Sequence, residues 1–236
     1  MKKIYLFSLL SVSVIGSYAQ ALFNNNGADI YVKDGAFVIV KTNSLYNNQV
    51  AGSGFIDNQG TVVVEGSVTN DGTITASGDT IRLSGDWVNN SSYSGNNSWV
   101  DMNGGNQQIT GTSVTTFNNL NLGGGSVVKR QTINAVTTVS LALNNAELAT
   151  DVNEMLVSNT ATNAITRNNG FVSSIGTGKL SRNTAAASAY NFPTGSPSYN
   201  NGPSIYRPID FTPAGSAANT FGAMLVKGDA SADGYD

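Results

Sequence analysis

The sequence predicts an all-β protein in which short strands wind into a parallel β-helix, also called a β-solenoid. An apolar residue, a spacer, Asn and a small polar pair recur ahead of a new apolar run, at residues 56–61, 68–73 and 87–92. A repeated strand–corner–strand unit of this kind is typical of a solenoid. Only 11 % of the residues are charged, against a usual ~25 %, and the helix formers Leu, Glu and Lys are scarce, so long helices are not expected.

The spacing of the corners gives the length of a coil. Successive coils are 18, 20, 24, 22 and 24 residues long if equivalent corners open at these positions: Phe55, Thr73, Tyr93, Phe117, Val139 and Asn163. About seven coils of three short strands, stacked in parallel at ~4.8 Å, would form a rod on the order of 35 Å long. A 12-residue half-coil, as between Asn58 and Asn70, is an alternative register, and a β-sandwich of the same strands is an alternative fold.

Stacked coils place apolar side chains in inward columns and suit Asn at the corners. Asn tolerates positive φ at a bend, and its amide can bond to the same residue one coil above. The predicted corner residues are Asn58, Asn70, Asn89, Asn118 and Asn119. The predicted inward residues are Val62, Val64, Ile74, Ile81, Leu83, Val100, Ile109, Leu120, Leu122, Val127, Val139, Leu141, Leu156 and Ile165.

Residues 1–19 are predicted to be a signal peptide. Lys2 and Lys3 precede the apolar residues 4–15, a stretch too short to span a membrane, which needs ~20 residues. Small residues before Gln20 suit cleavage after Ala19. We therefore expect an exported protein that lies in the extracellular space or on the outer cell surface.

Three further segments are predicted after the leader. Residues 20–54 are an N-terminal cap or an irregular first coil, because the terminal repeats of solenoids are usually atypical. Residues 55–183 are the β-solenoid repeats. Residues 184–236 are a β-rich module that contains all five prolines and has strands suited to sheet edges. We expect this module to be incomplete and the chain to be the front part of a longer protein.

The composition excludes several classes of function. The chain has no Cys and no His, which rules out disulfides, a thiolate nucleophile, a Cys/His zinc site and a Ser-His-Asp triad. The formal net charge is −3, which argues against nucleic acid or anionic lipid as partner, since both require a basic face. Lys129 and Arg130 are a basic pair too small for a nucleic-acid site.

Several motifs together resemble the repeat regions of large secreted surface proteins of gliding, Bacteroidota-type bacteria. The matching stretches are residues 85–90, 107–112, 116–120, 170–180, 192–196 and 206–208. The resemblance covers most of residues 55–212 and implies export, often by the type IX route, and a role in adhesion or in the extracellular matrix. It supplies no catalytic residues. Such proteins usually end in a sorting or gliding-associated C-terminal domain, which we do not recognise in this sequence.

Three candidate sites remain. Asp79, Arg82 and Asp86 could project from one coil, an arrangement that resembles β-helix polysaccharide lyases, which use Asp for calcium and a basic residue as proton acceptor; a solvated strand and corner is the simpler interpretation. The aromatic residues Trp87, Tyr93 and Trp99 could stack on sugar rings, but apolar filling of the coil is favoured. A weak calcium candidate has oxygen ligands at alternate positions near the end of the chain: Asp229, Ser231, Asp233 and Asp236.

The expected role is therefore that of a secreted, non-catalytic surface protein that acts as an adhesive or structural stalk. No cofactor is expected other than calcium at the weak site. The expected partner is a cell-surface or matrix polysaccharide or protein. A carbohydrate-binding module is the first alternative and would need aromatic side chains on one outer face. A β-helix polysaccharide lyase is the second and would need convergent Asp, Lys or Arg in a groove.

Overall fold

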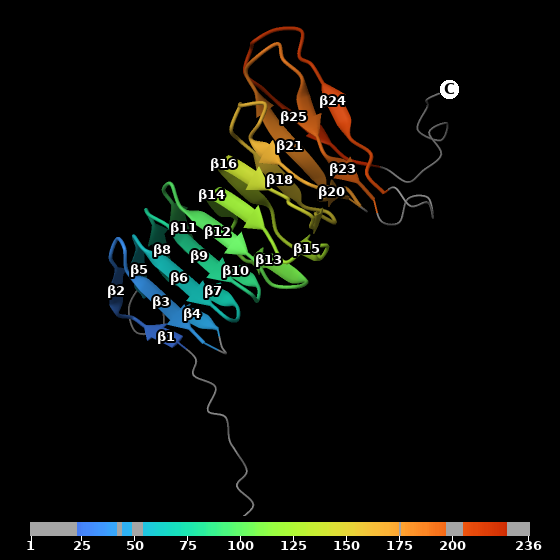
Figure 1. Ribbon diagram of the computed structural model, residues 1–236. Coiled ribbons are helices and arrows are strands. Elements are labelled where there is room, and N and C mark those ends of the chain that lie inside the picture. Colours follow the sequence, from blue (N-terminus) through green and yellow to red (C-terminus); the bar gives the residue numbers. More distant parts are fainter. Residues whose placement is uncertain (1–22, 42–43, 49–53, 175, 197–204, 226–236) are drawn as a thin grey trace, which may run out of the picture.

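The computed structural model describes residues 23–41, 44–48, 54–174, 176–196 and 205–225. This part of the chain is all β, with 25 strands and no helix. Most of the strands are parallel and stack into a β-solenoid of about eight turns (Figure 1), which confirms the predicted fold class. No helix in the described ranges is long and apolar enough to cross a membrane. The proposed signal peptide and calcium ligands lie outside the described residues.

Three sheets run along the solenoid (Figure 1). The first sheet consists of β1 (Phe23–Asn26), β4 (Leu45–Asn48), β7 (Val68–Asn70), β10 (Trp87–Asn89), β13 (Gln107–Gly111), β15 (Val128–Gln131), β17 (Glu147–Ala149), β20 (Phe171–Ser173) and β23 (Thr194–Gly195). The second consists of β2 (Asp29–Val32), β5 (Phe55–Asn58), β8 (Thr73–Ala76) and β11 (Ser92–Gly95).

The third sheet continues to the C-terminal end. It consists of β3 (Phe37–Val40), β6 (Thr61–Val64), β9 (Thr80–Leu83), β12 (Trp99–Met102), β14 (Thr115–Leu122), β16 (Ala135–Ala142), β18 (Glu154–Val157), β21 (Lys179–Thr184) and β25 (Asn219–Ala223). The short strand β19 (Ile165–Thr166) also pairs with β16, and β22 (Tyr190–Phe192) pairs with β24 (Ile209–Phe211).

The strand register shows how long each turn is. Phe55 pairs with Thr73, 18 residues later, whereas Asp29 pairs with Phe55, 26 residues later. These distances bracket the predicted spacing. The pairing of β6 with β9 is parallel, as a solenoid requires and as an antiparallel hairpin across the same residues would not allow. Beyond β11 the second sheet ends, and the eight-residue strands β14 and β16 replace two shorter strands and the corner between them.

Apolar side chains fill the interior in columns that run from coil to coil. In the third sheet, one column of paired, buried residues consists of Val62, Ile81, Val100, Leu120 and Leu141. Every strand of the column presents a branched or long aliphatic side chain to the neighbour above and below, so burial of the column favours this single register. These five inward assignments are confirmed.

Two predicted inward residues are wrong. Val139 is 40 % exposed, because the register shifts between Phe117 and Asn119 and leaves extra residues on β16 unpaired. Leu156 is half-buried and lies between Met155 and Val157, which are the buried residues of β18. Side chains of a strand alternate between faces, so a shift of one residue moves the whole strand to the wrong side. Val127 and Ile165 are half-buried and pack against the core.

Four buried asparagines form a hydrogen-bonded ladder along the first sheet. The Nδ2 atoms of Asn25, Asn47 and Asn70 each donate to the Oδ1 atom of the Asn one coil further on, at 2.8, 2.9 and 2.9 Å, and Asn89 ends the series. The predicted Asn-to-Asn bond is thus confirmed for Asn70 and Asn89. Gly111 occupies the next position with a φ of 126°, and a Cβ there would lie 2.0 Å from the backbone oxygen of Asn89.

The other predicted corner asparagines do not join this ladder. Asn58 belongs to the second sheet, where its paired neighbours are Val32 and Ala76, and both polar atoms of its buried side chain lack a partner among the described residues. Asn58 and Asn70 are therefore not equivalent, which is wrong for the half-coil register. Asn118 donates to Thr138, and Asn119 donates to the backbone of Ser98 and to Asn118.

Antiparallel strands cover the C-terminal end of the solenoid. β25 pairs with β21 from Leu180–Ala223 to Thr184–Asn219, and β22 pairs with β24. Under these strands the buried guanidinium of Arg182 donates to the carbonyl oxygens of Asn191, Ala161 and Thr162. The parallel stack itself runs from β1 to β23, so the described parts of residues 20–54 and 184–236 contribute strands to the same sheets.

Candidate binding groove

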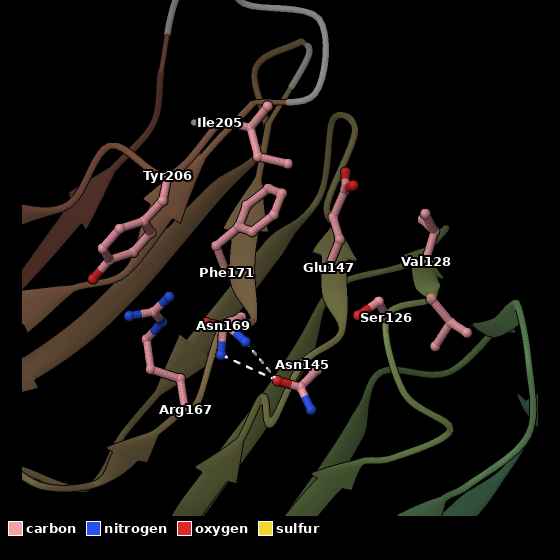
Figure 2. Close-up of a pocket in the computed structure, with 10 residues that line it drawn as sticks. Ser126, Val128, Asn145, Glu147, Arg167, Asn169, Phe171, Ile205 and Tyr206 are labelled. Atoms are coloured by element: carbon pink, nitrogen blue, oxygen red, sulfur yellow. Dashed lines mark hydrogen bonds between the residues drawn. The ribbon is translucent and has the colours of Figure 1, made fainter. Parts of the chain in front are cut away.

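A hollow of about 470 Å³ lies on the outer face of the first sheet near the end of the parallel stack (Figure 2). Its floor includes three residues that are in register on neighbouring strands: Val128 of β15, Glu147 of β17 and Phe171 of β20. The residue that follows each of them points inward and is buried, since side chains alternate along a strand. The solenoid thus brings together residues that are 19 and 24 positions apart in the sequence.

The wall of the groove comes from the chain that returns along β23. The backbone N–H of Ser196 donates to the Ile205 carbonyl at 2.9 Å, and the N–H of Arg207 donates to the Thr194 carbonyl at 2.8 Å. These bonds place Ile205 and Tyr206 beside Phe171, as Figure 2 shows. The wall is therefore held by backbone pairing rather than by side-chain contacts alone.

Arg167 lies against this wall. Its guanidinium carbon is 3.8 Å from the centroid of the Tyr206 ring, which is a close cation–π contact. Its Nε donates to the carbonyl oxygen of Gly170. Within the described ranges its two terminal nitrogens have neither a hydrogen bond nor an ion pair. The guanidinium plane is therefore fixed, while two nitrogens remain able to donate to a ligand.

Glu147 is the acidic group of the groove. It is half-buried on β17, and the Ser173 hydroxyl donates to its Oε1 atom. Burial raises the pKa of Glu147, and the nearby Asp151 charge acts in the same direction, while the hydrogen bond from Ser173 opposes them. The carboxyl group thus takes up a proton more readily than an exposed Glu does.

Two asparagines complete the polar lining. The side chain and the backbone N–H of Asn169 donate to Oδ1 of Asn145 at 3.2 and 3.4 Å (Figure 2). These residues occupy corresponding corners of successive coils, 24 positions apart. Each amide carries both donors and an acceptor, so the pair can bond to hydroxyl groups of a ligand while holding its own geometry.

A second hollow of about 300 Å³ continues along the same face. It shares Val128 with the groove and is lined also by Asp86, Asn106, Gln108 and Arg130, together with the buried Gln107. The two hollows follow the solenoid axis across successive coils. Their combined lining is mostly amide and charged groups around a small apolar strip.

The structure does not bring the predicted lyase-like residues together. Arg82 points outward from the third sheet, where its Nε donates to Asp101 at 2.7 Å. Asp79 accepts from the Thr61 hydroxyl at 3.3 Å. Asp86 lies at the entrance to the first sheet and accepts from the Gln108 N–H at 2.7 Å. Arg82 therefore has a structural partner already, and the three residues face different neighbours.

The three candidate aromatic residues divide between inside and outside. Trp87 is fully buried, donates from Nε1 to the Thr115 hydroxyl at 3.0 Å and meets the Tyr93 ring edge-on at 4.9 Å. Burial raises the pKa of Tyr93 to about 12, although its contact with Ser98 opposes the shift. Trp99 is 37 % exposed on the third sheet, beside a hollow of about 180 Å³ that Arg82 also lines.

Lys129 and Arg130 have opposite environments. Arg130 is exposed and pairs with Asp151 at 2.5 Å. Lys129 is completely buried, and its ammonium donates to the carbonyl oxygens of Gly104 and Gly105 at 2.9 and 2.8 Å and to the side chain of Gln107. Burial lowers the pKa of Lys129 to about 8, with Asp101 opposing the shift. This lysine thus serves the interior and is no part of a basic surface.

Sequence reasoning missed the groove residues Glu147, Arg167 and Tyr206. No local motif marks them, because their proximity depends on the exact coil register and on the return of the chain along β23. The apolar–Asn phrase concerns the corners alone. Across the described ranges, no group of three or more Asp or Glu could hold a metal ion.

Comparisons of the chain with protein-family models, with curated proteins and with solved structures found no match. The class of protein is therefore defined by its own features: a β-solenoid that carries a polar groove on one outer face.

Proposed function

We propose that this chain is a secreted, non-catalytic surface protein that acts as an adhesive or structural stalk. The main support is a row of bonded polar side chains on the outer face of the third sheet. Asp101 accepts from Arg82 and from Asn121, and Asn144 donates to Asn121, each at 2.7 Å. A pre-arranged polar row that crosses four coils suits weak, repeated contacts with a polysaccharide or protein, whose combined strength grows through multivalency.

The chemistry of the groove also favours binding over catalysis. Glycosidases with paired carboxylates need two acids ~5 to 9 Å apart in different environments. Among the described residues that line the groove, Glu147 is the single acid. The predicted leader, residues 1–19, supports export to the extracellular space or the outer cell surface.

The first test concerns location and activity. We expect the protein on intact cells to be digested by added protease, and the purified protein to leave a panel of polysaccharides undegraded with or without calcium. Depolymerisation that is abolished by Asp79→Ala, Arg82→Ala or Glu147→Gln would overturn the non-catalytic role in favour of a lyase or hydrolase. Protection from protease in intact cells, with digestion only after lysis, would contradict surface location.

A carbohydrate-binding module is the second candidate. It is supported by the groove, where Tyr206 and two amides surround a hollow of about 470 Å³, within the usual range of ligand sites. The exposed Trp99 supplies a separate aromatic surface. Loss of polysaccharide binding on Tyr206→Ala, with retention on Trp99→Ala, would place binding in the groove.

A further inference from the structure

We infer that the groove binds a carboxylate-bearing sugar, such as a uronic acid unit of an acidic polysaccharide, and that the guanidinium of Arg167 binds the carboxylate. This inference rests on the proposed surface role and names the chemical class of ligand for one site on that surface. It is carried by the geometry of Arg167, by the charges around it and by the polar lining opposite.

The first step is the orientation of Arg167. Stacking on Tyr206 at 3.8 Å and the bond from Nε to Gly170 fix the plane of the guanidinium before any ligand binds. The remaining terminal nitrogens form the planar fork that matches two carboxylate oxygens. Because the side chain is already ordered, binding loses little conformational entropy.

The second step is charge. The two outward arginines Arg82 and Arg130 are neutralised by Asp101 and Asp151. Arg167 contacts no carboxylate within the part of the chain that the structure describes. Its positive charge is therefore uncompensated in a partly enclosed groove, where a ligand carboxylate would be its natural counter-ion.

The third step is the other side of the hollow. Glu147 lines it, but burial raises the pKa of this carboxyl group, so repulsion of an anionic ligand weakens as the pH becomes mildly acidic. A protonated Glu147 would also be able to donate to a ligand oxygen. Binding is thus expected to strengthen toward acidic pH until the ligand carboxylate itself takes up a proton.

The fourth step distinguishes a sugar from an acidic peptide. Asn145 and Asn169 offer donors and acceptors to hydroxyl groups, and Tyr206 offers a ring edge. The adjoining hollow continues the same lining through Asn106 and Gln108 along the solenoid axis. A linear polymer with hydroxyl groups on every unit matches this repeated amide lining better than a peptide does.

The test compares two oligosaccharides that differ only in the carboxylate. The purified protein is titrated calorimetrically with a β-1,4-linked glucuronic acid oligomer and with the cello-oligosaccharide of equal length. We expect the glucuronic acid oligomer to bind at least tenfold more tightly, and this preference to shrink as salt is added. Equal binding of the two oligomers, or no binding of the acidic one, would overturn the inference but would leave the surface location to its own test.

Variants assign the preference to Arg167. Arg167→Gln is expected to abolish the preference for the acidic oligomer, and Arg167→Lys is expected to restore it only in part, because a lysine keeps the charge and loses the planar fork. Arg82→Gln is the matched control and should bind as the unmodified protein does, with thermal unfolding recorded for all three. Retention of the preference in Arg167→Gln, or tighter binding of a polyglutamate peptide than of the sugar, would contradict the inference.

Discussion

The buried polar side chains of this solenoid differ in how completely they are hydrogen-bonded. Asn47 and Asn70 each meet an asparagine on both sides, and Lys129 is surrounded by three oxygen acceptors. Asn58 is equally buried, but neither polar atom has a partner in the described part of the chain. An unpaired buried polar group costs free energy that a paired one does not.

The same substitution at two asparagines should therefore have different effects. Asn70→Leu removes the donor to Asn89 and the acceptor for Asn47, so we expect the free energy of unfolding to fall by about 1 to 3 kcal/mol or more. Asn58→Leu replaces an unpaired amide between Val32 and Ala76, so we expect no loss or a gain of up to ~1 kcal/mol. Urea unfolding of both variants measures the difference, and equal destabilisation would show that Asn58 is bonded in solution.

Lys129 should make stability depend on alkaline pH. Its pKa is lowered from 10.5 to about 8 in the folded protein, so between these values the unfolded chain holds a proton that the folded chain has released. Stability rises with pH wherever the unfolded state binds more protons, here by at most ~1.4 kcal/mol per pH unit. We expect the free energy of unfolding of the unmodified protein, relative to Lys129→Met, to increase from pH 8 toward 10.5.

The control for this pH effect is Lys179→Met, which changes an exposed lysine near Glu154. It should leave the relative pH dependence flat over the same range. A slope that survives in Lys129→Met would assign the effect to another group.

At the scale of single strands, the outcome depends on which face each residue occupies. Ile81 and Val63 lie on neighbouring strands of the third sheet, but Ile81 is 4 % exposed in the apolar column and Val63 points outward. Ile81→Asp places an unpaired charge in the column, and we expect a loss of several kcal/mol. Val63→Asp carries the same charge on the outer face and should cost less than ~1 kcal/mol. Similar thermal unfolding of the two variants would contradict the register.

The strands also show what the sequence could predict. The fold class and the central column followed from the recurring Asn corner and the alternation of Val, Ile and Leu, since period-two burial is a local property. Val139 and Leu156 were misassigned, because an irregular register in β16 and a one-residue offset in β18 leave no local mark. Both are settled by pairing with the adjacent coil, which a single strand does not reveal.

The groove was beyond the reach of the sequence for a related reason. Arg167, Glu147 and Tyr206 come from three separate segments, and the last returns only through backbone bonds to β23. The sequence marked Asp79, Arg82 and Asp86 instead, because they are close in the chain. Closeness in a coil of about twenty residues does not place side chains on the same face.

At the scale of the whole molecule, the two ends of the stack differ. The C-terminal strands β21 and β23 are covered by antiparallel pairing with β25 and with the bridge at Tyr206. In the described ranges, β1, β2 and β3 each pair with a strand on one side only. Solenoid stability is roughly the sum of repeat and neighbour terms, so protection should decrease toward the first coil.

Hydrogen exchange tests this difference. Peptides that cover β2 and β3 are expected to exchange much faster than peptides from β12 and β14, while β21 exchanges nearly as slowly as the centre. Mass spectrometry of the purified protein at several exchange times measures the order. Uniform protection along the chain would contradict it and would indicate that the first coil is stabilised as well as the others.

The asparagine ladder has a directional consequence. Every amide in it donates toward the following coil, so the side-chain dipoles of Asn25, Asn47, Asn70 and Asn89 add head to tail along the rod axis. Hydrogen bonds in such a chain polarise one another, and the last donor meets the Ser113 carbonyl at 3.4 Å. The solenoid therefore carries a short polar filament, built from side chains, whose positive end points toward the coil where Gly111 interrupts the series.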